Sequence, residues 1–447
     1  MRQIKGLKMG SKLLAFTLIF LGASAQAEVM NKYPLQALVK SALEHQPSVA
    51  ISYYETEKAL SNLQTAKADL YPKLDHTTSA TNDRKKSNRN DLNLENKINL
   101  SYRLADFGVR DSNIKRSEYD KNGSDIDFLK SKTIVAKEVS SSYLNINKGK
   151  EILNGIKQEK IFYKKMLENF SLLVSSGVAM ESDLRKVQIS IDSLNTREIN
   201  YQSMLDTEIF KLKNMAGIDL LPEQIEKTSP LFINYNFMKD RQKVLDEVTH
   251  GNYDYKMLVA ARQAAQQEIK AAKSAYYPTV DINTGYSQNN PGGSATKSDH
   301  EDQLSIGLSI NFNIFDGFRN SAQDLKAASS YAQSQLHLDD FILQTKYNID
   351  SLASKYNAAT QTYMVNKRSY ENALGLSALY EQEFQLGQKS LLDLISSRNE
   401  SFQAYISMID GQYDVYDVKL QQLVLVSRLN NHLGIDKMPT KIPNHIK

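Results

Sequence analysis

Residues 66–75 read AKADLYPKLD, and the pattern returns at residues 272–281 as AKSAYYPTVD, a shift of 206 positions. Five of the ten positions are identical. Three further matches follow in the same order: Asp106 with Asp316, Gly177 and Asp183 with Gly387 and Asp393, and Gly217 with Gly434. Self-similarity that keeps its order over a long distance indicates a repeat architecture. We therefore interpret the chain as a tandem duplication of a unit of about 200 residues.

Each unit carries a pair of expected β-strands after its Tyr-Pro. In residues 304–314, six apolar side chains alternate with five small or polar ones, the period of a strand with one apolar face. Residues 92–104 repeat this alternation except at Asn96, and weaker partner strands are expected at about 74–82 and 279–287. The sequence thus predicts β-hairpins at about 74–104 and 279–314, with polar loops at 83–91 and 289–294.

Helices are expected on both sides of each hairpin. Residues 35–70 and 244–276 are rich in helix formers, and the 67 residues from Phe318 to Phe384 contain one Gly and no Pro. A helix of that length would extend for roughly 100 Å. Apolar residues then step by four and three, as in the seam of a coiled coil, at Phe402, Ile406, Ile409, Tyr413, Tyr416, Leu420 and Leu423. Gly177 and Gly387 are expected at the turns where long antiparallel helices double back.

This pattern divides the chain into a series of segments. We expect a first repeat at 28–217 with its helical tip near 177, a linker at 218–243 that contains Pro222 and Pro230, a second repeat at 244–434 with its tip near 387, and a polar tail at 435–447. Residues 1–27 have the basic start, the apolar run and the Ala25-Gln26-Ala27 site of a secretory signal peptide. A membrane anchor is the alternative, but the apolar run is only about half of the ~20 residues that a spanning helix needs.

The charge and composition exclude several functions. The chain has 55 Lys and Arg against 51 Asp and Glu, and the four basic residues of the signal segment account for the excess, so no nucleic-acid partner is expected. The absence of Cys excludes disulfides, thiolate zinc sites and iron–sulfur clusters. Seven His residues lack ligand spacing, and no nucleophile or phosphate-loop motif is complete. We therefore expect no enzyme activity, no metal and no cofactor.

The strands, in contrast, favour a membrane barrel. No later segment is apolar enough for a helical span, so embedding in lipid would require strands without an open edge. Four strands cannot close, and an eight-stranded barrel is filled by its own side chains. Twelve strands from three chains form the smallest closed barrel with an open lumen, while a non-channel, elongated coiled-coil surface adhesin or structural protein remains the alternative.

Taken together, these features resemble the TolC family of outer-membrane efflux and type I secretion channels. The resemblance rests on the duplicated plan, the Tyr-Pro motifs, the turns Asp106-Phe107-Gly108 and Phe315-Asp316-Gly317, and the Gly-x5-Asp tips. It implies a homotrimer with a 12-stranded outer-membrane β-barrel and a periplasmic α-helical tunnel. It also implies a periplasmic membrane-fusion (adaptor) protein and an inner-membrane ABC exporter or proton-driven pump as partners. The lack of an N-terminal lipid-bearing Cys is similar to the secretion-type branch.

The helical tips are the candidate site. Lys389 and Asp393 are four residues apart, and Asp183 is the residue of the first repeat that corresponds to Asp393. Their spacing alone predicts an exposed i,i+4 ion pair that contributes under ~0.5 kcal/mol to stability. The resemblance instead implies a pore constriction ringed by Asp393, with Lys389 tied to Asp183 of the other hairpin, and tips near Gly177, Gly387 and Phe384 that dock the partner.

Two departures from the family pattern concern this gate. The family's second ring Asp corresponds to Ser396, and its linking Tyr corresponds to Phe384. The resemblance therefore implies a closed state with fewer polar contacts in this chain.

Overall fold

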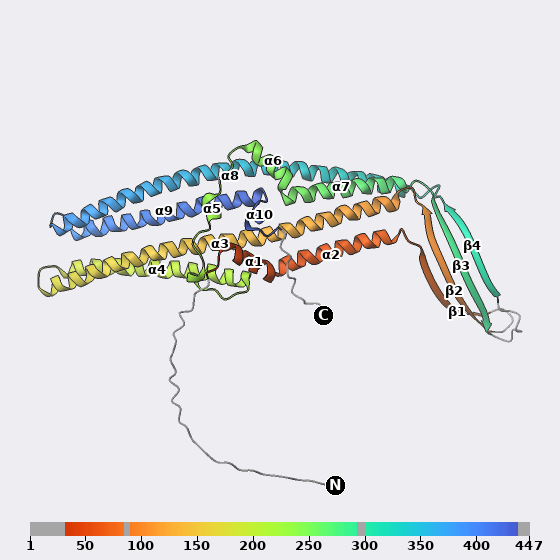
Figure 1. The fold of residues 1–447 in the computed structure, drawn as a ribbon, viewed down its shortest axis with the longest axis horizontal. Coiled ribbons are helices and arrows are strands. Elements are labelled where there is room, and N and C mark those ends of the chain that lie inside the picture. The colour runs from red at the N-terminus through yellow and green to blue at the C-terminus, as the bar shows by residue number, and fades with distance from the viewer. Residues whose placement is uncertain (1–31, 85–89, 293–300, 437–447) are drawn as a thin grey trace, which may run out of the picture.

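The computed structural model describes residues 32–84, 90–292 and 301–436, and the expected signal peptide lies outside these ranges. The molecule is elongated, with helices along most of its length and a four-stranded sheet at one end (Figure 1). Helices α3 (Val109–Ser175) and α8 (Arg319–Gln385) have 67 residues each. They turn back into α4 (Glu181–Ala216) and α9 (Leu391–Leu425), and both hairpin tips lie at the end away from the sheet (Figure 1). The predicted long antiparallel helices are thus confirmed.

Both tips turn at a glycine in the left-handed region, where φ is 75° at Gly177 and 73° at Gly387. After each glycine, the next amide donates to a carbonyl five residues back, from Val178 to Leu173 at 2.8 Å and from Gln388 to Glu383 at 2.8 Å. These bonds satisfy carbonyls that the ending helix leaves unpaired. A side chain at either glycine would strain the backbone, so the two repeats use the same residue for the same turn.

The shorter helices correct one expectation. Each of the two continuous helices predicted at 35–70 and 244–276 is broken, giving the segments α1 (Leu35–His45), α2 (Pro47–Ala68), α6 (Arg241–Gly251) and α7 (Tyr253–Ser274). Gln46 is extended because it precedes Pro47, which disfavours helical geometry in the residue before it. Asn252 is also extended, and its side chain accepts the amide of Tyr255 at 3.1 Å, which starts a new helix.

The sheet consists of β1 (Lys73–Arg84), β2 (Asn90–Ala105), β3 (Thr279–Gly292) and β4 (Glu301–Asn311), all antiparallel in the order β1-β2-β3-β4. The hairpins of the two repeats therefore join through β2 and β3. Strand β3 continues to Gly292, so the loop predicted at 289–294 begins too early, because Asn289 pairs with Glu301 and Glu95.

Strand β4 is shorter at its end than predicted. It ends at Asn311, which leaves Phe312 and Ile314 outside the sheet. The reason is the approach of α8, whose first amides, from Arg319 and Asn320, donate to the Asp316 carboxylate at 3.0 and 2.9 Å. This carboxylate satisfies the helix start and directs the chain out of the strand.

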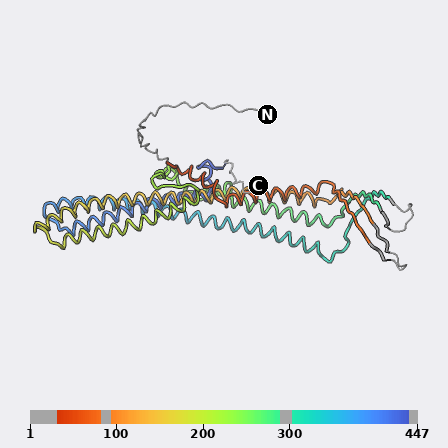
Figure 2. Tube along the Cα trace, turned by 90° about the horizontal axis from the view of Figure 1, so that it is seen from below, coloured from red at the N-terminus to blue at the C-terminus, as the bar shows by residue number. Residues whose placement is uncertain are grey.

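The core follows the contact between the two helical hairpins. All seven predicted seam residues, from Phe402 to Leu423, are at most 9% exposed. Short helices η1 (Pro222–Gln224), α5 (Pro230–Asn234) and α10 (Leu429–Leu433) lie against the middle of the molecule. Ile435 is fully buried, so the polar tail expected from 435 begins later than predicted. A second view shows the helices as a narrow layer rather than a compact bundle (Figure 2).

Candidate functional site

At the second tip, Asp393 caps its own helix. The Ser390 hydroxyl accepts the Asp393 amide at 3.2 Å, while the Asp393 carboxylate accepts the Ser390 hydroxyl at 2.7 Å and the Ser390 amide at 3.2 Å. These bonds form a capping box and favour the charged carboxylate. Hydrogen bonds from the Ser390 side chain and then its backbone lower the pKa of Asp393. The carboxylate therefore remains negative and solvent-facing.

The other two predicted gate residues, Lys389 and Asp183, each have a partner on their own hairpin. Lys389 places its ammonium 4.4 Å from the ring centroid of Tyr380, a cation–π contact. Asp183 forms an ion pair with Lys186, with Nζ and Oδ1 3.0 Å apart. The structure of one chain thus places Lys389 and Asp183 on separate hairpins, each with a local partner.

Phe384 contacts the first hairpin from the inner side. Its ring stacks on Phe170, with centroids 6.2 Å apart and planes inclined by 28°. The exposed residues that flank the turns include three apolar ones, Val178, Met180 and Leu386, which are 74%, 72% and 72% exposed. None of these three was among the predicted docking residues, although apolar side chains beside a predicted turn glycine are a usable signal.

A largely buried ion pair lies between the hairpins. Arg398 of α9 donates to Glu159 of α3 through two bonds, Nε to Oε2 at 3.2 Å and Nη2 to Oε1 at 3.0 Å. Their side chains are only 18% and 16% exposed, and the guanidinium lies 4.1 Å from the centroid of Phe162. Burial raises the pKa of Glu159, which the charge of Arg398 opposes but does not cancel. Sequence spacing gave no signal for this pair because its members are 239 positions apart.

Further polar contacts continue this connection between α3 and α9. The hydroxyl of Tyr405 donates to the carbonyl of Glu151 at 3.1 Å, and that of Tyr413 donates to the Glu151 carboxylate at 2.9 Å. Lys148 and Asp410 form an ion pair at 3.3 Å. The two hairpins of one protomer are thus joined by side chains as well as by their apolar seam.

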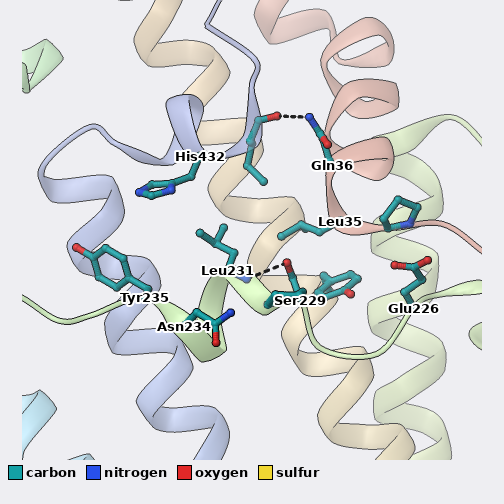
Figure 3. Close-up of a pocket in the computed structure, with 12 residues that line it drawn as sticks. Leu35, Gln36, Glu226, Ser229, Leu231, Asn234, Tyr235 and His432 are labelled. Carbon is teal, nitrogen blue, oxygen red and sulfur yellow. Dashed lines mark hydrogen bonds between the residues drawn. The ribbon is translucent and has the colours of Figure 1, made fainter.

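A cavity of about 510 Å³ lies beside the linker (Figure 3). Its wall brings together all three parts of the chain: Leu35 from the first repeat, Ser229 and Tyr235 from the linker, and His432 from the second repeat. Ser229 caps α5 by accepting the amide of Leu231 at 3.3 Å, and Gln36 donates to the carbonyl of Leu433 at 2.8 Å. These polar groups connect backbone segments. Across the described ranges, no three His, Asp or Glu side chains are grouped to hold a metal.

The sheet has one apolar face and two open edges. On β4, Leu304, Ile306 and Leu308 are 63–73% exposed, and the intervening residues are small or polar. Ile98, Leu100 and Leu104 extend the apolar face onto β2. Strands β1 and β4 each pair on one side alone. Within the described part of the chain, no helix is both long and apolar enough to span a bilayer.

Long paired helical hairpins with an amphipathic, open-edged sheet at one end are the architecture of an outer-membrane channel protein. The sequence agrees, because the model of the outer membrane efflux protein family matches residues 38–218 and 244–424. The chain belongs to this family. The two matched segments follow the duplication recognised in the sequence.

Three relatives support this assignment, two of them over most of their length. The chain is 21% identical to the protease secretion protein PrtF of Dickeya chrysanthemi over 424 residues, which cover 90% of the chain and 88% of PrtF. It is 19% identical to the outer membrane protein TolC of Escherichia coli over 420 residues, which cover 90% of the chain and 84% of TolC. The outer membrane efflux protein BepC of Brucella suis is 25% identical over 189 residues, which span 42% of the chain and 41% of BepC.

Solved structures show the same fold. The outer membrane protein VceC of Vibrio cholerae has a TM-score of 0.74 at 15% identity, over 88% of this chain and 95% of VceC. The open-state MtrE channel of Neisseria gonorrhoeae has a TM-score of 0.73 at 16% identity, over 91% of each chain. The resemblance to the TolC family is therefore confirmed. This protein is an outer-membrane export channel, with its helical part in the periplasm, and it is not an enzyme.

Proposed function

We propose that three copies of this chain form one duct, which serves as the passive exit of a tripartite export system. The open edges of the sheet carry this proposal. In hydrocarbon, the unpaired backbone groups of β1 and β4 each need a partner strand. A neighbouring copy supplies that strand, and three copies close a 12-stranded barrel wide enough for a lumen.

The sides of the helical layer support the same assembly. On α8, exposed Leu325, Leu336, Leu343 and Tyr347 are spaced by 11, 7 and 4 residues, which places them along one helix face. The outer helix of the other hairpin, α4, exposes Ile189, Ile199, Met204 and Phe210. Apolar stripes of this kind on a soluble surface mark contacts with another protein. A neighbouring copy would cover both stripes and continue the barrel as a helical tunnel.

The gate is assigned to the tips. On a threefold axis, three Asp393 carboxylates would meet at the narrow end of the tunnel and attract cations. Lys389 would leave its Tyr380 ring to reach Asp183 of the adjoining hairpin, which would hold the ring closed. Phe384 supports the tip from inside by its contact with Phe170.

The partners are an adaptor in the periplasm and a pump in the inner membrane. The exposed residues Val178, Met180 and Leu386, next to Gly177 and Gly387, offer apolar contacts for the adaptor. The pump, an ABC exporter or a proton-driven transporter, supplies the energy. The cargo is a polypeptide, as the name of PrtF states for that relative, or a small molecule. A non-channel adhesin would leave the open, apolar sheet without an explanation.

The assembly is tested by native mass spectrometry of protein extracted from outer membranes in mild detergent. We expect a complex of three mature chains that resists dissociation until it is heated. A membrane-inserted monomer, or an assembly with another number of chains, would contradict the trimer. Deletion of the genes that encode the adaptor and the pump should abolish export while the trimer remains in the membrane.

A further inference from the structure

The strand register arranges the apolar face of the sheet in rows that cross all four strands. One row consists of Leu74, Leu100, Thr284 and Ile306, and the next row outward consists of His76, Ile98, Tyr286 and Leu304. The row after that consists of Thr78, Asn96, Gln288 and Asp302, which we call the polar row. Every side chain of the polar row carries a polar group that can form hydrogen bonds, whereas the rows below it are mainly apolar.

The polar row is poorly suited to hydrocarbon. Thr78 donates to the side-chain oxygen of Asn96 at 2.8 Å, and its hydroxyl lies 3.2 Å from the Nε2 atom of His76. These bonds leave the Asn96 amine and the Gln288 amide in need of external partners. Each polar group without a partner in hydrocarbon costs several kcal/mol. Water and lipid headgroups provide such partners, but acyl chains do not.

Aromatic residues mark the opposite boundary, where the strands meet the helices. Phe107 stacks on Tyr277 with centroids 5.5 Å apart, and Phe315 meets Phe318 edge-on at 5.6 Å. All four rings are more than half exposed. Tyr and other aromatic side chains gather at the interfaces of membrane proteins, where an apolar ring can meet polar headgroups.

The distance between the two boundaries matches a membrane. In β3, Gln288 of the polar row lies nine residues after Thr279, which follows Tyr277 by two residues. At ~3.3 Å per residue and a strand tilt of ~40°, this stretch spans roughly 23 Å along the membrane normal, close to the height of ~25 Å of the apolar band of an outer-membrane barrel. The band therefore ends at the polar row.

We propose that the polar row lies at the outer boundary of the hydrocarbon and contacts the headgroups of the outer leaflet. The described part of the sheet beyond it then stands outside the membrane as a collar, formed by residues 79–84, 90–95, 289–292 and 301. The polar row contains no Lys or Arg, so it suits hydroxyl and amide groups of headgroups rather than phosphate. Among the described side chains of the collar, Leu94 is large and apolar, but its partners in register are Ala80 and Asn290. This inference rests on the proposed barrel.

The chain has no Trp, so single Trp residues can report depth without background. We would place Trp at Leu308, Ile306, Asn96 or Gln288 in trimers reconstituted with lipids brominated in the middle of the acyl chain. Ser309, on the opposite face, provides the control position. We expect strong quenching and blue-shifted emission at 308 and 306, and loss of most quenching with red-shifted emission at 96 and 288.

The outcomes separate the two proposals. Equal quenching at 96, 288 and 306 would overturn the boundary but leave the barrel intact. Quenching at none of the four positions would overturn both. As a second measurement, the variant N96L/Q288L should lengthen the apolar band, so its trimer should be most heat-stable in lipids with longer acyl chains than the wild type requires. An unchanged lipid optimum would contradict the boundary.

Discussion

Arg398 of α9 and Glu159 of α3 form a two-bond ion pair that connects the two helical hairpins of one protomer. The pair lies close to the tips, where Asp183 and Lys389 each contact a residue of their own hairpin. A movement that separates α9 from α3 must therefore break this buried pair. Within one chain, Arg398 therefore connects the two hairpins, whereas Asp183 and Lys389 do not.

Removal of Arg398 alone should be costly. Arg398→Met would leave the Glu159 carboxylate buried without a counter-charge, and we expect a loss of about 3–5 kcal/mol of stability. The double variant E159L/R398M replaces both charges by apolar groups and should recover most of this loss. Thermal unfolding of the purified trimer, followed by circular dichroism, measures both. A double variant as unstable as Arg398→Met would contradict this account of the pair.

The same pair predicts a dependence on pH. Burial raises the pKa of Glu159, so the folded state holds the proton more tightly than the unfolded state does. The contribution of Glu159 to the free energy of unfolding is therefore fully present below the pKa of this residue in the unfolded chain, about 4.3. It is lost as the pH rises through the pKa of Glu159 in the folded protein. In Arg398→Met the pKa should rise further. The difference in melting temperature between this variant and the wild type should therefore be smaller at pH 5 than at pH 7, and a constant difference would contradict the burial of Glu159.

Gly155 should not tolerate a side chain. A Cβ atom there would lie 2.4 Å from the Tyr405 ring, which holds its position by donating to the Glu151 carbonyl. We expect Gly155→Ala to cost about 1–3 kcal/mol through overpacking, despite the better helix propensity of Ala. Gly375→Ala is the matched control, because a Cβ atom there has no neighbour within 4 Å. The two melting temperatures should shift in opposite directions, and a stabilised Gly155→Ala trimer would show that the seam is loosely packed.

The sequence predicted most local features but not the contacts between distant segments. The 67-residue α8, the turn at Gly387 and the apolar seam depend on neighbouring residues, so their periodicity and backbone preferences were sufficient. The break at Gln46 is also local, but the prediction of one helix over 35–70 was wrong there because it gave too little weight to Pro47. The pair of Glu159 and Arg398 depends on how two helices pack, which no spacing encodes. The end of β4 depends on the cap that Asp316 provides to α8.

Charge at the tips should control ion selectivity. Asp393→Ala removes both the charge and the cap, so it should reduce cation selectivity and relieve block by multivalent cations in planar bilayers. Asp393→Asn removes the charge but keeps an acceptor for Ser390, whereas Ser390→Ala weakens the cap and keeps the charge. The two Asp393 variants should therefore agree with each other and differ from Ser390→Ala.

Lys389 should instead affect opening. Its replacement by Ala removes the cation that we assign to a link with Asp183, so single-channel conductance should rise while selectivity changes little. Lys186→Ala is the control, because it removes the lysine that pairs with Asp183 on its own hairpin and leaves Lys389 in place. If neither Lys389→Ala nor the Asp393 variants change conductance, block or selectivity, the tip charges are a solvated surface and the gate lies elsewhere.

The orientation of the sheet can be tested at β4. Leu308 is 63% exposed in a single chain and lies near the middle of the apolar band between the aromatic rings and the polar row. Leu308→Arg would place a charge near the bilayer midplane, at a cost of about 2–4 kcal/mol, and should reduce the amount of inserted trimer in outer-membrane fractions. Ser309→Arg, one residue along the strand, directs the same charge to the opposite, lumen-facing side. It should leave insertion unchanged, because water in the lumen solvates the guanidinium. Equal insertion of the two variants would mean that the apolar face of β4 does not meet lipid.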